Sequence, residues 1–185
     1  MSNRTSLTVI PGANQLFLRE EELRLGIDLI YFAARDLATE VEGLARRLST
    51  EESTISSSHL RLLSFLRGEA PQPSARVMRL MRQSKQSFSR TCSVLVARDW
   101  ILQAPLAEDR RQHHLSLTQA GRELEAQVAA RLNGALARAY RQAGATAVTG
   151  MREVLLGLVS DAEALRYLQV CPPFPCLREA GGSLT

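Results

Sequence analysis

The chain has 185 residues and a formal net charge of +4, with 45% hydrophobic and 23% charged residues. These proportions are those of a globular protein and exclude a disordered chain. Three cysteines are too few, and odd in number, for a disulfide scaffold, and no apolar run approaches the roughly 20 residues that cross a bilayer. The N-terminus also lacks the pattern of a signal peptide, so we expect a cytoplasmic protein with reduced cysteines and no membrane partner.

The charge is distributed unevenly along the chain. Residues 20–53 carry nine acidic and four basic side chains, for a net −5, whereas residues 61–114 carry ten basic and four acidic ones, for a net +6. Between Pro71 and Arg98 there are six basic residues and no acidic one. A basic central segment indicates a polyanionic partner.

Residues 20–48 are predicted to form one long helix after an N-terminal arm over residues 1–19. A helix of about 29 residues spans roughly 43 Å, which is more than a compact domain needs. We therefore favour packing of this helix on a second subunit over packing within one chain. The helix is predicted from a heptad seam of eight apolar positions, Leu23, Ile27, Ile30, Ala34, Leu37, Val41, Leu44 and Leu48.

Two shorter helices are expected after a polar, serine-rich linker over residues 49–58. The first begins at about Ser58 and stops near Gly68. Ser74 is expected to cap the second, which runs through Arg82.

A fourth helix is predicted from a cap at Ser84 to about Arg98. Two helices joined by a tight turn, the second with an exposed polar and basic face, are typical of a helix-turn-helix. The inner face is assigned to Phe88, Cys92, Leu95 and Val96, and the outer face to Lys85, Gln86, Ser89, Arg90 and Ser93.

A β-hairpin is expected next, with strands over residues 100–103 and 112–117. The loop between them, residues 104–111, carries Glu108, Asp109, Arg110 and Arg111 at its tip. A hairpin directly after a helix-turn-helix is interpreted as a wing. The predicted fold is therefore mainly α with a small β-hairpin wing, a winged helix-turn-helix with a helical dimerisation region.

The C-terminal third is predicted to be helical. Thr118 caps a helix that ends at about Ala143, before Gly144, and Gly121 is interpreted as a point where two backbones approach closely. One last helix is expected over roughly residues 146–169. The tail, residues 170–185, is rich in proline and is expected to be flexible.

The stretch from Asp109 to Gly121, DRRQHHLSLTQAG, carries a D-x-R motif followed by L-T-x-x-G. In this stretch, and in the segment from Ser84 to Arg90, the chain resembles the MarR family of winged-helix transcriptional regulators. The order of elements agrees with that family from about residue 16 to 168. Residues 16–24 and 139–144 are similar to a PetP-like bacterial subgroup.

The resemblance implies a homodimer with one recognition helix and one wing per subunit. The DNA-binding lobe then covers about residues 58–118, and the dimerisation helices about 20–48 and 118–169. The recognition helix would enter the major groove and the wing tip the adjacent minor groove. Arg111 matches the arginine of the motif, and Asp109 matches the acid that fixes the wing by pairing with an arginine.

Two positions depart from the family pattern. Arg82-Gln83 stands in the turn where the family often has glycine or another small residue followed by an apolar one. Asp99 replaces a glycine that is common just before the first wing strand. Both departures concern the geometry of turns and leave the predicted fold unchanged.

The residue types on the fourth helix and the wing suit DNA. Gln86 can pair bidentately with adenine, and Arg90 or Lys85 with guanine. One of Arg110 and Arg111 is expected in the minor groove, and we favour Arg111 from the motif. Each residue alone could equally be part of a solvated surface. Donors to phosphates are expected from Ser84, Ser87 and Ser89.

No catalytic, metal or cofactor pattern is visible. His113 and His114 are adjacent in a strand, so their side chains point to opposite faces and do not chelate one ion together. Cys92 is expected to be a buried apolar residue, whereas Cys171 and Cys176 flank prolines in the tail. We expect no enzyme.

The leading hypothesis is a sequence-specific regulator that acts as a homodimer on a pseudo-palindromic operator, with a small-molecule effector as an open option. One alternative is a helical protein-interaction module that keeps the fold without specific DNA binding. Another is a cysteine-based redox sensor.

Overall fold

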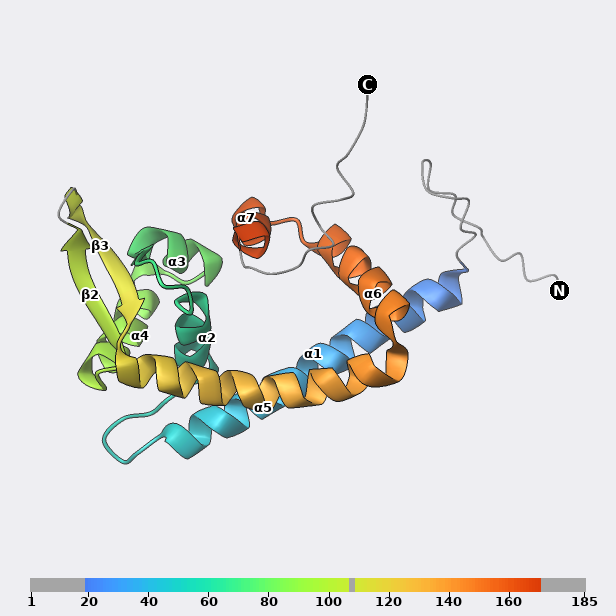
Figure 1. The fold of residues 1–185 in the computed structure, drawn as a ribbon, viewed down its shortest axis with the longest axis horizontal. Helices are drawn as coiled ribbons and strands as arrows, with labels where there is room; N and C mark the ends of the chain where they lie inside the picture. The colour runs from blue at the N-terminus through green and yellow to red at the C-terminus, as the bar shows by residue number, and fades with distance from the viewer. Residues whose placement is uncertain (1–18, 107–108, 171–185) are drawn as a thin grey trace, which may run out of the picture.

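The computed structural model describes residues 19–106 and 109–170. Of residues 106, 109–112, 169 and 170 it describes the backbone alone. The described residues confirm the predicted fold class, mainly α with a small β-hairpin wing (Figure 1). No helix within them is both long and apolar enough to cross a membrane. In chain order the elements are α1 (Glu20–Leu48), α2 (Ser57–Phe65), β1 (Gln72–Pro73), α3 (Ser74–Leu80), α4 (Lys85–Ala97), β2 (Ile101–Leu106), β3 (Asp109–Leu117), α5 (Gln119–Ala143), α6 (Ala145–Leu158) and α7 (Ala162–Val170).

The apolar core lies in the lobe formed by α2, α3, α4 and the sheet. Its most deeply buried side chains include Leu62, Leu63, Leu95 and Leu115. The end of α1 and the start of α5 reach this core, whereas the first half of α1 and all of α6 extend away from it (Figure 1). The chain is therefore divided into a packed lobe and an arm of helices.

The sheet is larger than the predicted hairpin. Its strand order is β1-β3-β2, and β1 pairs antiparallel with β3, with Gln72 opposite Leu115. The sequence did not indicate β1, because two residues are too short for an alternating pattern and one of them is Pro73. Residues 104–106 and 109–111 extend the strands into the predicted loop, and Pro105 is tolerated because β2 is an edge strand.

Three helix boundaries differ from the prediction in the centre of the chain, one of them the end of α3, which lies at Leu80 and not at Arg82. α2 covers Ser57–Phe65 and ends before Gly68, with Leu66 as its C-cap. Ser74 is wrong as a cap, because it is the first residue inside α3 and Pro73 occupies the cap position without a side-chain bond.

The single helix expected over residues 146–169 is two helices. Val159 has an extended backbone, with φ −80° and ψ 109°, and ends α6. A carboxylate oxygen of Asp161 then accepts the backbone N–H groups of Glu163 at 2.9 Å and Ala164 at 3.1 Å, which caps α7. The apolar spacing continues across this break, so periodicity alone did not reveal it.

A close backbone contact joins the wing to α5. The Thr118 hydroxyl accepts the N–H of Gly121 at 2.9 Å and donates to the Asp99 carbonyl at 2.6 Å, while the Thr118 N–H donates to the Trp100 carbonyl at 3.2 Å. A Cβ on Gly121 would lie 1.9 Å from the Trp100 carbonyl oxygen. The predicted roles of Thr118 as a cap and of Gly121 as a point of close approach are confirmed.

His59 forms part of the N-terminal cap of α2. The backbone N–H of Ser56 donates to His59 Nδ1 at 3.0 Å, and the Ser56 hydroxyl lies 2.8 Å from the same nitrogen. The ring is 8% exposed, and burial lowers the pKa of His59 from its ordinary value of 6.5. Since Nδ1 accepts from the backbone, the capping arrangement requires the neutral ring.

We expect Gly121→Ala to lower the free energy of unfolding by about 1–3 kcal/mol, because the methyl group forces the backbones of α5 and the wing apart. Urea denaturation measures the change. Gly134→Ala on the same helix is the control: its Cβ would meet only an arginine side-chain nitrogen at 3.9 Å, so we expect stabilisation by about 0.5–1 kcal/mol. Equal effects of the two substitutions would contradict the close contact.

The protein is expected to lose stability in mild acid through His59. Its folded pKa lies below 6.5, so the unfolded chain takes up the proton first as the pH falls. The stability that the neutral His59 contributes is therefore fully present above pH 6.5 and is lost as the pH falls toward the lowered pKa of the folded state. His59→Gln keeps a capping-box residue without titration and should reduce the Tm difference between about pH 7.5 and 5.5. The control His113→Gln, at an exposed position, should leave this Tm difference unchanged. If His59→Gln also leaves it unchanged, His59 is not the cause of the acid sensitivity.

Candidate nucleic-acid interface

α4 begins at the predicted cap. Ser84 has an extended backbone, and its hydroxyl accepts the N–H of Ser87 at 3.2 Å. The buried face consists of Phe88, Thr91, Cys92 and Leu95. Val96, which was assigned to this face, is 43% exposed, because it lies at its edge and Thr91 occupies the place beside Phe88.

The predicted outer face of α4 is exposed. Among the described residues, neither Lys85 nor Arg90 forms an ion pair, and the first turn contains no acidic residue. The Thr91 and Ser93 hydroxyls donate to backbone carbonyls one turn earlier, at 3.1 and 2.9 Å. The helix thus presents free cations and its positive N-terminal end on one side. The exposed candidates are Ser84, Lys85, Gln86, Ser87, Ser89 and Arg90.

The wing candidates fall in β3. The backbone of Asp109 pairs with Leu106, next to the end of the hairpin. The side chains of Asp109, Arg110 and Arg111 lie outside the described ones, so their roles stay predictions. Farther along β3, His113 is opposite Pro105 and His114 opposite Ala104.

Both departures from the family pattern coincide with left-handed backbone. Arg82 has a φ of 49° and Asp99 a φ of 54°. A side chain in this conformation costs roughly 1–2 kcal/mol, which explains why glycine suits these positions. The turns keep their geometry without glycine because backbone hydrogen bonds close them: the Arg82 N–H donates to the Arg79 carbonyl at 3.0 Å, and the Asp99 N–H donates to the Val96 carbonyl at 2.9 Å. The Arg82–Asp161 pair and the bond from the Thr118 hydroxyl to the Asp99 carbonyl add to them.

Cys92 is not suited to redox chemistry. The thiol is buried, and burial raises its pKa to about 11, so it stays protonated near neutral pH. Cys171 and Cys176 lie outside the described residues. Within residues 19–106 and 109–170, no cluster of three histidine, cysteine, aspartate or glutamate side chains could hold a metal ion.

A cavity of about 770 Å³ lies between α1, α2, α5 and the turn before α4. Its wall is mainly apolar, but Glu125, Arg67 and Gln83 also contribute. Burial raises the pKa of Glu125, and Arg67 opposes this shift. The buried side-chain oxygen of Gln83 has no hydrogen-bond partner among the described residues.

The sequence analysis missed the acidic partners of the helix-turn-helix. Arg76 pairs with Glu163 at 2.7 Å, and Arg82 pairs with Asp161. The two pairs join residues 87 and 79 positions apart, so no local pattern could have indicated them.

Residues 53–112 match the sequence model of the MarR family. The chain is 28% identical over 156 residues to the HTH-type transcriptional regulator PetP of Rhodobacter capsulatus, and the match covers 84% of this chain and 91% of that protein. These matches confirm the family resemblance that the wing motif predicted.

Solved structures of the family share the fold. A MarR family transcription regulator superimposes with a TM-score of 0.62 at 17% identity, covering 75% of this chain and 88% of that one. A mutant of MarR from E. coli, complexed with operator DNA, gives a TM-score of 0.55 at 18% identity, covering 75% of this chain and 96% of the other.

We expect Ser84→Ala to destabilise the protein by about 1 kcal/mol, because the N–H of Ser87 loses its partner at the start of α4. Ser74→Ala is the matched control: its side chain does not cap α3, so its effect should stay within about 0.5 kcal/mol. Thermal unfolding of both variants measures the difference. A larger loss for Ser74→Ala would contradict the cap assignment.

Proposed function

We propose that the chain is a transcriptional regulator of the MarR type, without enzymatic activity, that binds a pseudo-palindromic operator as a homodimer; the family model, the PetP relative and the shared fold support this. The observation that carries this proposal is α4, a capped helix with an exposed basic and polar face and no acidic residue in its first turn. Such a helix fits the major groove of double-stranded DNA. The protein would then act in the cytoplasm.

Each proposed interaction with DNA has a chemical reason. Gln86 has the donor and acceptor that adenine requires, and Arg90 or Lys85 can donate to guanine. The hydroxyls of Ser84, Ser87 and Ser89 suit phosphates. Arg110 and Arg111 are proposed for the minor groove, with Asp109 supporting the wing.

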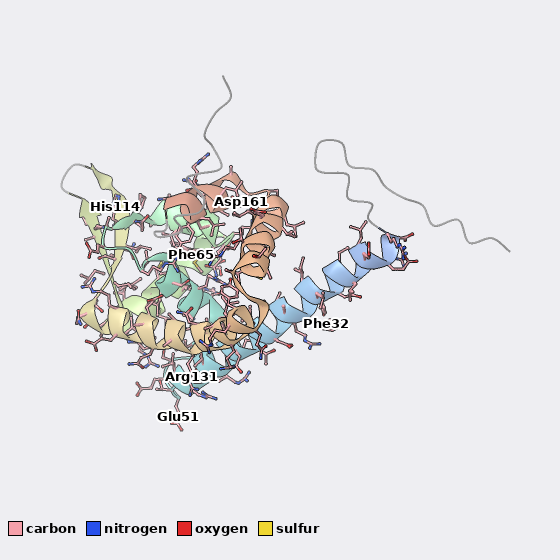
Figure 2. The ribbon with its side chains drawn as sticks, turned by 45° about the vertical axis from the view of Figure 1, so that its right-hand side comes forward. Phe32, Glu51, Phe65, His114, Arg131 and Asp161 are labelled. Atoms are coloured by element: carbon pink, nitrogen blue, oxygen red, sulfur yellow. The ribbon has the colours of Figure 1, made fainter. Side chains whose placement is uncertain are left out.

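The dimer is supported by apolar side chains that the single chain leaves uncovered. On α1 they follow the predicted heptad seam and widen it, and Figure 2 shows Phe32 on the part of this helix that projects from the lobe. Exposed apolar surface of this extent marks an interface. We propose residues 20–48 and 118–169 as dimerisation helices and 58–118 as the DNA-binding lobe. The exposed residues include Leu25, Ile27, Leu29, Ile30 and Phe32 of α1 and Met151, Val154, Leu155 and Leu158 of α6.

A small-molecule effector is favoured by the cavity beside the helix-turn-helix. Its wall joins α1 and α5 to the turn residue Gln83, so a ligand there would contact both the proposed dimerisation helices and the lobe. The Gln83 oxygen, which has no partner within the part of the chain that the structure describes, and Glu125 would select a ligand that donates hydrogen bonds from an otherwise apolar body.

We expect Arg111→Ala to weaken binding to an operator fragment, selected from genomic DNA, by about tenfold, the equivalent of roughly 1.4 kcal/mol. The reason is the loss of one guanidinium from the minor groove. Fluorescence anisotropy at fixed salt measures Kd, and far-UV circular dichroism checks the fold. Arg131→Ala, an exposed arginine on α5, makes the same charge change outside the lobe and should have little effect. Equal Kd values for the two variants would refute the wing assignment.

A further inference from the structure

α7 returns from the helical arm and packs against the helix-turn-helix. It lies beside α3, and Figure 2 shows Asp161, just before α7, on the same side of the lobe as Phe65. The Tyr167 hydroxyl donates to the Ser64 carbonyl at 3.3 Å, and its ring meets Phe65 edge to face, with centroids 5.1 Å apart. These polar and apolar contacts with α2 hold α7 against the lobe.

Two acids at the start of α7 are paired with arginines of the lobe. One oxygen of Glu163 lies 2.7 Å from Arg76 Nε, and the other 3.0 Å from Arg166. One oxygen of Asp161 accepts from Arg82 Nη2 at 3.0 Å and from Nε at 3.2 Å, while its second oxygen caps α7. The carboxylates are thus fixed in position by the helix that carries them.

The paired arginines lie in the part of the lobe that precedes the recognition helix. Arg76 is on α3, and Arg82 is in the turn, two residues before the Ser84 cap. Both belong to the segment from residue 71 to 98, which has six basic residues and no acid of its own. Asp161 and Glu163 therefore place two negative charges beside a surface whose own residues, 71–98, include no acid.

A phosphate group can take the place of the carboxylate in each of these two ion pairs. A guanidinium donates to a carboxylate and to a phosphate through the same N–H groups, so Nε of Arg76 and Nε and Nη2 of Arg82 are occupied while the pairs are formed, and a phosphate must compete for them. The Arg82 side chain is 73% exposed, and an exposed ion pair contributes little to stability because water solvates both partners when they separate. Arg76 is more enclosed, at 27% exposure, and its release requires α7 to shift.

We propose that the start of α7 is an acidic latch, in which Asp161 and Glu163 compete with DNA phosphates for Arg76 and Arg82. The inference rests on the proposed DNA binding. With the latch closed, two basic side chains per subunit are neutralised beside the recognition helix. With it open, the same side chains bind additional phosphates, so the position of α7 sets the affinity of the lobe for DNA.

The double variant Asp161→Asn, Glu163→Gln removes both charges and conserves shape, and an amide at position 161 still accepts the two N–H groups that begin α7. The control Glu51→Gln, Glu52→Gln removes two exposed carboxylates between α1 and α2, outside the proposed dimerisation helices and the DNA-binding lobe. Both variants therefore change the net charge equally. Binding to a random-sequence duplex is measured against salt, because phosphate recognition does not depend on sequence.

The latch predicts that the Asp161, Glu163 variant binds more tightly than the control at low salt. Its plot of log K against log salt should be steeper by roughly 0.9 for each additional phosphate that the protein neutralises. Adding Arg76→Gln and Arg82→Gln should abolish the tighter binding, while circular dichroism verifies the helices.

The same slope and affinity as the control would overturn the latch and leave the proposed function intact. Weaker binding than the control would overturn it too, and would assign α7 to positioning the lobe. If the wild-type chain binds neither random nor selected DNA, the proposed function fails and the latch with it.

Discussion

The contact between the backbones of Gly121 and Trp100 sets the position of α4 and the wing, the proposed DNA-binding surface, relative to α5. Three elements meet there: the end of α4, the start of the wing and the start of α5. Thr118 fastens them through its backbone and its hydroxyl, and the missing side chain of Gly121 lets them approach. Because α5 continues from this point into the helical arm, the orientation of the recognition helix is tied to the helices proposed to form the dimer.

The lobe maintains two strained turns around the recognition helix. Arg82 precedes α4 and Asp99 follows it, and both have left-handed backbones without being glycine. Strain of this kind persists when the surroundings determine the conformation. Backbone hydrogen bonds close both turns; Thr118 adds a hydrogen bond to the second, whereas an ion pair with Asp161, just before α7, adds to the first. The first turn is therefore the one whose surroundings can change when α7 moves.

Much of the fold follows from local patterns in the sequence. Apolar periodicity predicts α1, and cap residues predict the starts of α4 and α5, because each signal lies within one or two helical turns. The failures concern features that periodicity does not encode. β1 is too short for alternation, and the break before α7 keeps the apolar spacing on both sides.

The candidate site divides in the same way. The exposed face of α4 was predictable from helix geometry. The spacing of Phe88, Cys92 and Leu95 places them on one buried face, so the remaining side chains lie on the opposite face. The pairs of Arg76 and Arg82 with acids of the C-terminal segment were not, because they depend on where the chain returns in space. The wing residues Asp109, Arg110 and Arg111 stay predictions from the motif.

In the proposed regulator, a recognition lobe would be joined to an arm that pairs two subunits and to a C-terminal helix that masks part of the positive charge. The central claim is that two such lobes read DNA together. A hydroxyl-radical and dimethyl sulfate footprint of the protein on a selected genomic fragment tests it most directly. A homodimer on a pseudo-palindromic operator should give two symmetric major-groove protections whose centres lie about 10–10.5 base pairs, or a multiple of this spacing, apart. Protection of a single unsymmetric segment, or of none, would contradict it.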